Sequence, residues 1–114
     1  MESIKKNEDF RKCYKVGKSC ADRLLVVYHV KNGLDRSRLG ISVSKKVGNS
    51  VVRHRFARLV REAYRLHEST FDSGSDIVVV ARRSASGATY KEIETALLNL
   101  LRKSGICHEN TKSE

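Results

Sequence analysis

The longest regular pattern of apolar and polar residues lies in residues 50–67. Apolar side chains recur there every three or four positions, the spacing of an amphipathic helix that packs on a core. The stripe consists of Val52, Phe56, Leu59, Val60, Ala63 and Leu66. Asn49 precedes the stripe and is expected to cap the helix, which should end near His67.

Residues 19–31 and 39–44 show the shorter repeat of β-strands. The first segment contains RLLVVYHV, with apolar residues on both sides, and predicts one long strand covered on both faces. The second segment alternates strictly, with Leu39, Ile41 and Val43 inward. Asn32 and Gly33 form a turn signal between the segments, so the sequence predicts an antiparallel hairpin.

A third strand is predicted after the long helix. Residues 69–75 are rich in Ser, Thr, Asp and Gly and should form a loop. The following run DIVVVAR, residues 76–82, is apolar without interruption between two charges, which is typical of a central strand buried on both faces.

Two further helices are predicted near the ends of the chain. Asn7 is expected to cap a short helix that ends at Gly17, with Phe10, Cys13 and Tyr14 on one face.

The last helix should begin with a capping box, because Thr89 and Glu92 have the required spacing, and should end at Gly105. Its buried stripe is expected to contain Tyr90, Ile93, Leu97, Leu100 and Leu101.

These elements predict a single small two-layer α+β domain spanning residues 1–114, in the order αββαβα. A chain of 114 residues has room for one modest core and not for a second domain. The ordered part is expected to cover about residues 5–105, followed by a polar tail, residues 106–114. Strand, basic helix and strand can form a parallel crossover, which is ordinarily right-handed.

Charge adds a functional direction to this fold. The net charge is +10, and residues 45–65 carry seven Lys or Arg against one acid, Glu62. At about 100° per residue, His54, Arg58, Arg61 and Arg65 fall opposite the apolar stripe. Arg53 and Arg55 flank it.

A merely solvated helix face is the plain alternative, but such a face usually interleaves acids four residues from its bases. Here only Glu62 and Glu68 are available. Arginine's planar fork suits phosphate, so the pattern favours an external polyanion, either a nucleic acid or an anionic membrane surface.

The chain lacks the usual signals of a hydrolase that acts alone. It has no GxSxG, HExxH or P-loop motif and no dense carboxylate cluster, and its four histidines are scattered. Cys13, Cys20 and Cys107 have neither disulfide-framework nor zinc-ligand spacing. No apolar run approaches the roughly 20 residues of a membrane span, and the N-terminus lacks the apolar core of a signal peptide, so a cytoplasmic location is expected.

The run KKVGNSVVRHRFARLVREAY, with KNEDF upstream and an aromatic-bearing basic strand between them, resembles the protein subunit of bacterial ribonuclease P. The resemblance extends over about residues 5–103, with the segments in the same order. Arg53 and Arg55 match the two arginines of the family's Arg-Asn-Arg core, while His54 replaces the usual asparagine and Ala57 a common lysine.

The resemblance implies a protein that assists a catalytic RNA in removing the 5′ leader of precursor tRNA. The RNA subunit would hold the catalytic Mg²⁺, and the protein would bind no cofactor alone and contain no catalytic residue. One protein monomer is expected per RNA subunit. The family also implies a left-handed crossover.

The expected contacts with RNA fall in two groups. The first group should bind the catalytic RNA: Lys45, Lys46, Asn49, Arg53, His54, Arg55, Arg58, Arg61 and Arg65. The second group is implied by the resemblance to line a cleft for the leader, although ordinary core packing would explain the same aromatics: Phe10, Tyr14 and Tyr28.

Two other functions remain open from the residues alone. A non-catalytic ribosomal or RNA-assembly protein would use the same basic helix, but it does not explain why KNEDF, the strand tyrosine and the arginine helix occur together. A helix lying on a membrane is less favoured, because the apolar stripe is needed to cover the sheet.

Overall fold

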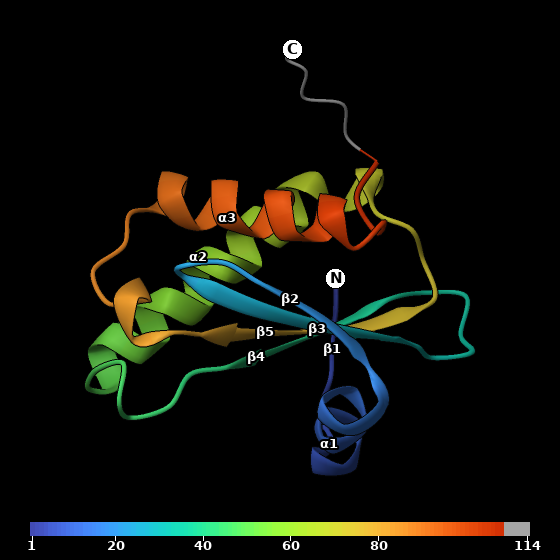
Figure 1. Cartoon of the computed structure of the whole chain (residues 1–114), viewed down its shortest axis with the longest axis horizontal. Helices are drawn as coiled ribbons and strands as arrows, with labels where there is room; N and C mark the ends of the chain where they lie inside the picture. Colours follow the sequence, from blue (N-terminus) through green and yellow to red (C-terminus); the bar gives the residue numbers. More distant parts are fainter. Residues whose placement is uncertain (109–114) are drawn as a thin grey trace.

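A five-stranded mixed sheet separates the helices into two unequal groups (Figure 1). The computed structural model describes residues 1–108. The strands lie in the order β1-β4-β5-β3-β2. They are β1 (Glu2–Ser3), β2 (Lys18–Ala21), β3 (Leu25–Lys31), β4 (Arg38–Ser42) and β5 (Ser75–Ala81). The helices are α1 (Asn7–Val16), α2 (Ser50–His67) and α3 (Tyr90–Lys103).

The predicted α+β class and the crossover through the basic helix are confirmed. Strands β4 and β5 are parallel neighbours, and α2 connects them. Helices α2 and α3 cover one face of the sheet, and α1 lies on the other (Figure 1). The expected two layers are the sheet and the pair α2 and α3, and α1 adds a partial third layer on the other face of the sheet. The handedness of the crossover stays a prediction.

Strand β5 is the centre of the core, as its unbroken apolar run predicts. Ile77 and Val79 point into the large cluster beneath α2 and α3, while Val78 packs with Cys13 of α1. All three β5 residues are fully buried. Because side chains alternate along a strand, apolar residues at consecutive positions require cover on both faces.

The predicted long strand over residues 19–31 is wrong, since a turn divides it into β2 and β3. The Asp22 carboxylate accepts hydrogen bonds from the backbone amides of Leu24 and Leu25, at 2.8 Å each. The amide of Asp22 donates to the carbonyl of Leu25 at 3.0 Å. An aspartate that bonds its own backbone two and three residues on favours a turn over continued strand.

The predicted hairpin between residues 19–31 and 39–44 is also wrong. Strand β3 pairs with β2 and β5, and β4 pairs with β5 and β1. The central position of β5 separates the two expected partners. Compared with the predicted order αββαβα, the structure has two more strands. One is β1, and the other arises because the first predicted strand is divided into β2 and β3.

Several predicted helix ends are confirmed. The Asn49 side chain accepts from the amide of Val52 at 3.0 Å, and Thr89 and Glu92 form the capping box of α3. Gly105 follows α3 with φ of 78°, a conformation that favours glycine.

The ends of α1 differ from the prediction. Lys6, not Asn7, is its N-cap, without a side-chain hydrogen bond. Gly17 has an ordinary φ of −75°, but a Cβ there would lie 2.4 Å from the Cys13 carbonyl oxygen and 2.9 Å from that of His29. Glycine is needed because the backbones approach closely.

The apolar stripe of α2 needs one correction. Leu66 is 67% exposed, whereas Tyr64, which was not assigned to the stripe, is 1% exposed. Near its end, α2 turns its buried side toward α3. Tyr64 packs on Phe71 with ring centroids 5.0 Å apart, and His67 Nε2 lies 2.8 Å from Glu94 Oε2 of α3.

Buried residues also lie just outside residues 5–105. Ile4 is buried beside α1, and Ile106 and Cys107 are buried in the main core. Phe71 and Cys107 form an isolated antiparallel bridge. The rest of the predicted tail, residues 109–114, lies outside the described residues.

A partly buried ion pair joins β4 to β5 and approaches α1. Arg38 Nε and Nη2 donate to the two carboxylate oxygens of Asp76 at 2.8 and 2.6 Å, and Asn32 donates to Asp76 Oδ1 at 2.9 Å. Arg38 Nη2 also lies 3.6 Å from Asp9 Oδ2 of α1. Burial raises the pKa of Asp76, but the Arg38 and Asn32 hydrogen bonds outweigh it and hold the pKa below its ordinary value.

The first prediction tests the buried side of α2. Leu59→Ala should lower the free energy of unfolding by about 2–5 kcal/mol, because Leu59 is 7% exposed within the core. Leu66→Ala removes the same atoms from an exposed site and should change it by less than about 0.5 kcal/mol. Urea unfolding followed by circular dichroism measures both, and equal losses would contradict the burial assignment.

The second prediction concerns acid stability. Because the pKa of Asp76 is lower when folded than when unfolded, its contribution is present above the ordinary carboxyl pKa of about 3.9 and is lost as pH falls through the folded value. The stability difference between the wild type and Asp76→Asn should therefore shrink as pH falls below about 4.

Unfolding by urea at a series of pH values measures this difference. Asp35→Asn is the matched control, because the Asp35 side chain is 93% exposed. A difference for Asp76→Asn that stays constant from neutral to acid pH would show that the ion pair does not stabilise the fold.

Candidate nucleic-acid interface

The outer face of α2 is cationic, as the spacing predicts. His54, Arg58, Arg61 and Arg65 are exposed on the side away from the core. Arg55 is exposed as well, whereas Arg53 is half-buried at the edge of the stripe. The core holds the other side of the helix through Phe56, Leu59 and Val60.

Neighbouring acids do not neutralise this face. Within residues 1–108, none of the five arginines of α2 forms an ion pair with a carboxylate. Glu68, one of the two acids available by sequence, lies 3.6 Å from the N-terminal amine of Met1. The charges of the helix are therefore left to interact with solvent or with an external anion.

The beginning of α2 adds further positive charge. Lys45 and Lys46 are exposed in the turn before the helix, and its first turn contains no acid. The turn is tight, because a Cβ on Gly48 would lie 2.7 Å from the Val52 side chain. Asn49 caps the helix with its side-chain oxygen. The helix dipole and the two lysines together make this end attractive to anions.

Two of the arginines predicted to bind RNA, Arg53 and Arg55, also contact the rest of the fold. Arg55 Nη1 donates to the carbonyl oxygen of Ala88 at 2.9 Å, which ties α2 to the segment after β5. Arg53 Nε is buried without a hydrogen-bond partner among the described residues. Arg58, Arg61 and Arg65 are the arginines of α2 most freely presented to a ligand.

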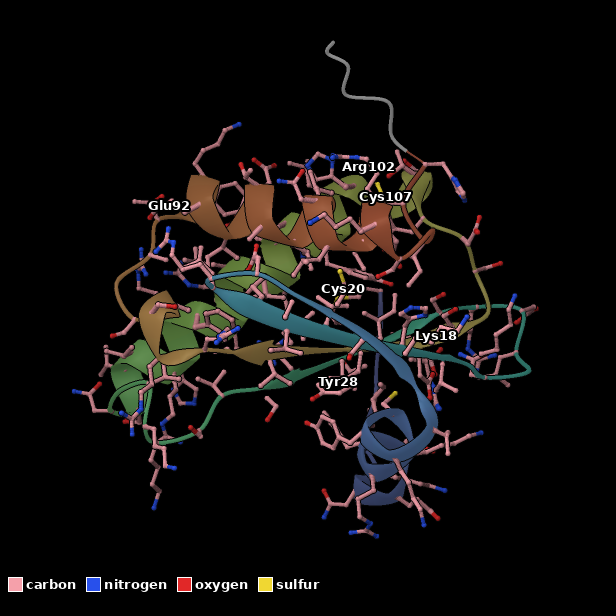
Figure 2. The ribbon with its side chains drawn as sticks, in the orientation of Figure 1. Lys18, Cys20, Tyr28, Glu92, Arg102 and Cys107 are labelled. Carbon is pink, nitrogen blue, oxygen red and sulfur yellow. The ribbon has the colours of Figure 1, made fainter. Side chains whose placement is uncertain are left out.

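The three predicted aromatic residues lie together on the opposite side of the sheet. Tyr14 of α1 and Tyr28 of β3 meet edge to face, with ring centroids 5.0 Å apart and planes at 83°. Phe10 packs against β4, where a Cβ on Gly40 would lie 2.7 Å from its ring. Figure 2 shows Tyr28 on the side of the sheet that faces α1, and Cys20 on the side that faces α3.

These aromatics are not all core residues. Tyr14 is 41% exposed, and Phe10 and Tyr28 are partly buried around Cys13 and Val78. We refer to Phe10, Tyr14 and Tyr28 as the aromatic surface. Phe10 and Tyr28 are held by packing, and the Tyr14 ring is exposed beside them. Such a surface suits stacking of an unpaired nucleobase.

One positioning residue was missed from the sequence. Arg38 holds the Asp76 carboxylate at the start of β5 and lies beside Asp9 at the start of α1. It thereby helps to fix α1 over the sheet. The available signal was weak, consisting of one arginine just before a predicted strand, residues 39–44, and one aspartate that begins another, residues 76–82.

Side-chain chemistry for independent hydrolysis is sparse in the described part of the chain. No group of three or more His, Cys, Asp or Glu side chains there could hold a metal ion. Burial, with help from Asp76, raises the pKa of the Cys13 thiol to about 11, so this thiol is neutral and a poor nucleophile. None of the helices within residues 1–108 is long and apolar enough to cross a membrane.

The chain matches known proteins over nearly its whole length. The Ribonuclease P family model matches residues 1–105. The ribonuclease P protein component of Alkaliphilus metalliredigens is 54% identical over 100 residues, covering 88% of this chain and 90% of the relative. That of Lachnoclostridium phytofermentans is 58% identical over 99 residues, covering 87% and 85%.

Solved structures agree with these sequence matches. The RNase P protein of Staphylococcus aureus superimposes with a TM-score of 0.88 and 41% identity, covering 95% of this chain and 99% of that one. The RNase P protein of Thermotoga maritima superimposes with a TM-score of 0.83 and 36% identity, covering 90% and 97%. With its fold, its basic helix and these relatives in agreement, the chain belongs to the ribonuclease P protein family.

Proposed function

We propose that this chain is the protein subunit of ribonuclease P and assists endonucleolytic removal of the 5′ leader from precursor tRNA. The observation that carries the proposal is the placement of two surfaces, one cationic and one aromatic, on opposite faces of one sheet. Helix α2 presents guanidinium groups on one side, and the aromatic surface lies on the other. The family to which the chain belongs gives this arrangement its biological setting.

Helix α2 is proposed to bind the catalytic RNA through its phosphates. Its exposed arginines have no acidic partner within the described chain, and the core fixes the helix from beneath. A row of guanidinium groups on a helix held by the core would neutralise the phosphates of an RNA backbone, and the planar fork of arginine suits phosphate oxygens. Lys45, Lys46 and the α2 N-terminus would extend the contact.

The aromatic surface is proposed to hold the single-stranded leader. Stacking accepts any base, because every base has a π-face, and leaders vary in sequence. The edge-to-face contact with Tyr28 fixes the Tyr14 ring, so an incoming base would meet a preorganised surface.

Catalysis is proposed to belong to the RNA subunit. The protein would orient the substrate and relieve phosphate repulsion, and Mg²⁺ would be bound by the RNA in the assembled enzyme. We further propose one protein monomer per RNA subunit, acting in the cytoplasm. A ribosomal or assembly role would use α2 equally well, but it assigns no task to the aromatic surface.

The third prediction tests α2. Arg58→Ala, Arg61→Ala and Arg65→Ala should each lower the slope of log K against log salt for binding a bacterial RNase P RNA by about 0.7–0.9 per lost phosphate contact. Filter binding across a salt series measures the slope, and thermal unfolding checks the fold. Wild-type slopes in all three variants would remove α2 from the interface.

The fourth prediction tests the aromatic surface in the assembled enzyme. Tyr14→Ala should weaken binding of precursor tRNA with a leader of several nucleotides by about 5- to 150-fold, which corresponds to about 1–3 kcal/mol for one stacked base. Binding of mature tRNA should change little, because it carries no leader. Tyr28→Ala should have the same effect, measured under conditions in which the variant is as fully folded as the wild type, because Tyr28 also packs around Cys13.

Tyr90→Ala serves as the control, because Tyr90 is a partly buried tyrosine of α3 on the other side of the sheet. Equilibrium binding of both tRNAs at one salt concentration gives the comparison. Equal losses for the two tRNAs in a stably folded Tyr14→Ala enzyme would assign Tyr14 to packing and favour the RNA-assembly role.

A further inference from the structure

Three arginines from distant parts of the sequence border a hollow at the end of the sheet next to the start of α2. Arg23 lies in the turn between β2 and β3, and Arg82 and Arg83 follow β5. With Ala21, Asp22 and Ser84 they line a hollow of about 760 Å³. We refer to Arg23, Arg82 and Arg83 with this hollow as the arginine hollow.

Hydrogen bonds to backbone carbonyl groups hold the two sides of the arginine hollow together. The amide of Arg82 donates to the Leu24 carbonyl at 2.9 Å, and Arg82 Nη1 donates to the Asp22 carbonyl at 3.1 Å. The Ser84 hydroxyl donates to the carbonyl oxygen of Arg23. The arginines are therefore presented from a rigid backbone, although all three are exposed.

Local acids leave the charge of the hollow largely uncompensated. The Asp22 carboxylate already accepts two backbone amides of its own turn. Glu92 of α3 is engaged in the capping box with Thr89, whose hydrogen bonds lower the pKa of Glu92, and the charge of Arg23 adds a smaller lowering. In the part of the chain that the structure describes, no carboxylate forms an ion pair with Arg23, Arg82 or Arg83.

The hollow is physically connected to α2. Arg55 of α2 donates to the Ala88 carbonyl at 2.9 Å, and Ala88 belongs to the same short connection that carries Arg82 and Arg83. Figure 1 shows this connection, in orange, beside the green beginning of α2. Positive charge thus continues from the helix across the connection to the turn at Arg23.

We propose that the arginine hollow binds a second stretch of phosphate backbone in the same RNA that α2 contacts. The inference rests on the proposed function. The lining contains no aromatic or large apolar side chain, so it offers neither a stacking surface nor an apolar pocket. Guanidinium groups, a hydroxyl and backbone atoms instead suit the oxygens of a phosphodiester chain.

The test measures salt dependence of binding to a bacterial RNase P RNA transcribed in vitro. The double variant Arg23→Ala/Arg83→Ala leaves the structural hydrogen bonds of Arg82 intact. Its slope of log K against log salt should fall by about 1.4–1.8, the sum for two phosphate contacts. Arg23→Lys/Arg83→Lys keeps the charges and should retain most of the slope.

Lys31→Ala is the matched control, because Lys31 is an exposed cation at the far end of β3 from the Arg23 turn. Thermal unfolding confirms that each variant is folded. A wild-type slope for the double alanine variant, or an equal fall for Lys31→Ala, would overturn the proposal. Failure of the proposed function is distinguishable, because the Arg58 and Arg61 variants would then also bind like the wild type.

Discussion

The need to cover β5 on both faces is the constraint on which the rest of this structure depends. Ile77 and Val79 require an apolar layer on one side, and Val78 requires one on the other. Helices α2 and α3 supply the first layer, and α1 supplies the second. Each helix buries one side against the sheet and exposes the other. The molecule therefore has two outward surfaces, the arginines of α2 on one side of the sheet and the aromatic surface beside α1 on the other.

This arrangement gives a small chain separate surfaces for the two proposed kinds of RNA contact. Arg58, Arg61 and Arg65 of α2 lie opposite the stripe that covers the sheet, so their replacement is expected to leave the core intact. The aromatic surface is different, because Phe10 and Tyr28 also contribute to packing around Cys13. The proposed phosphate contacts thus use side chains outside the core, whereas the proposed stacking contacts use some side chains that also pack in it.

Local signals predicted the helices well because their determinants are close in sequence. Asn49 and Thr89 cap their helices as expected, and the spacing around Phe56 and Leu59 defines a buried side. Strand pairing was predicted less well, because it depends on competition between distant segments. The turn signal at Asn32 is real, yet β5 takes the place beside β3 that a hairpin would have filled.

The candidate site shows the same division. Spacing alone placed Arg58 and Arg61 on an exposed face, whereas Tyr14 and Tyr28 could be paired only through a family resemblance. The arginine hollow had no signal in the sequence, because Arg82 lies 60 positions from Asp22, the neighbour of Arg23 to which it donates a hydrogen bond. Only the fold brings these charges to one end of the sheet.

Site-specific photocrosslinking in the reconstituted enzyme tests the central claim, the assignment of the two faces to two RNAs, most directly. A photoreactive phenylalanine analogue at position 14 should crosslink to the leader of precursor tRNA, and the same analogue at position 61 should crosslink to the catalytic RNA. Crosslinks from both positions to the same RNA, or from position 14 to catalytic RNA alone, would contradict the account.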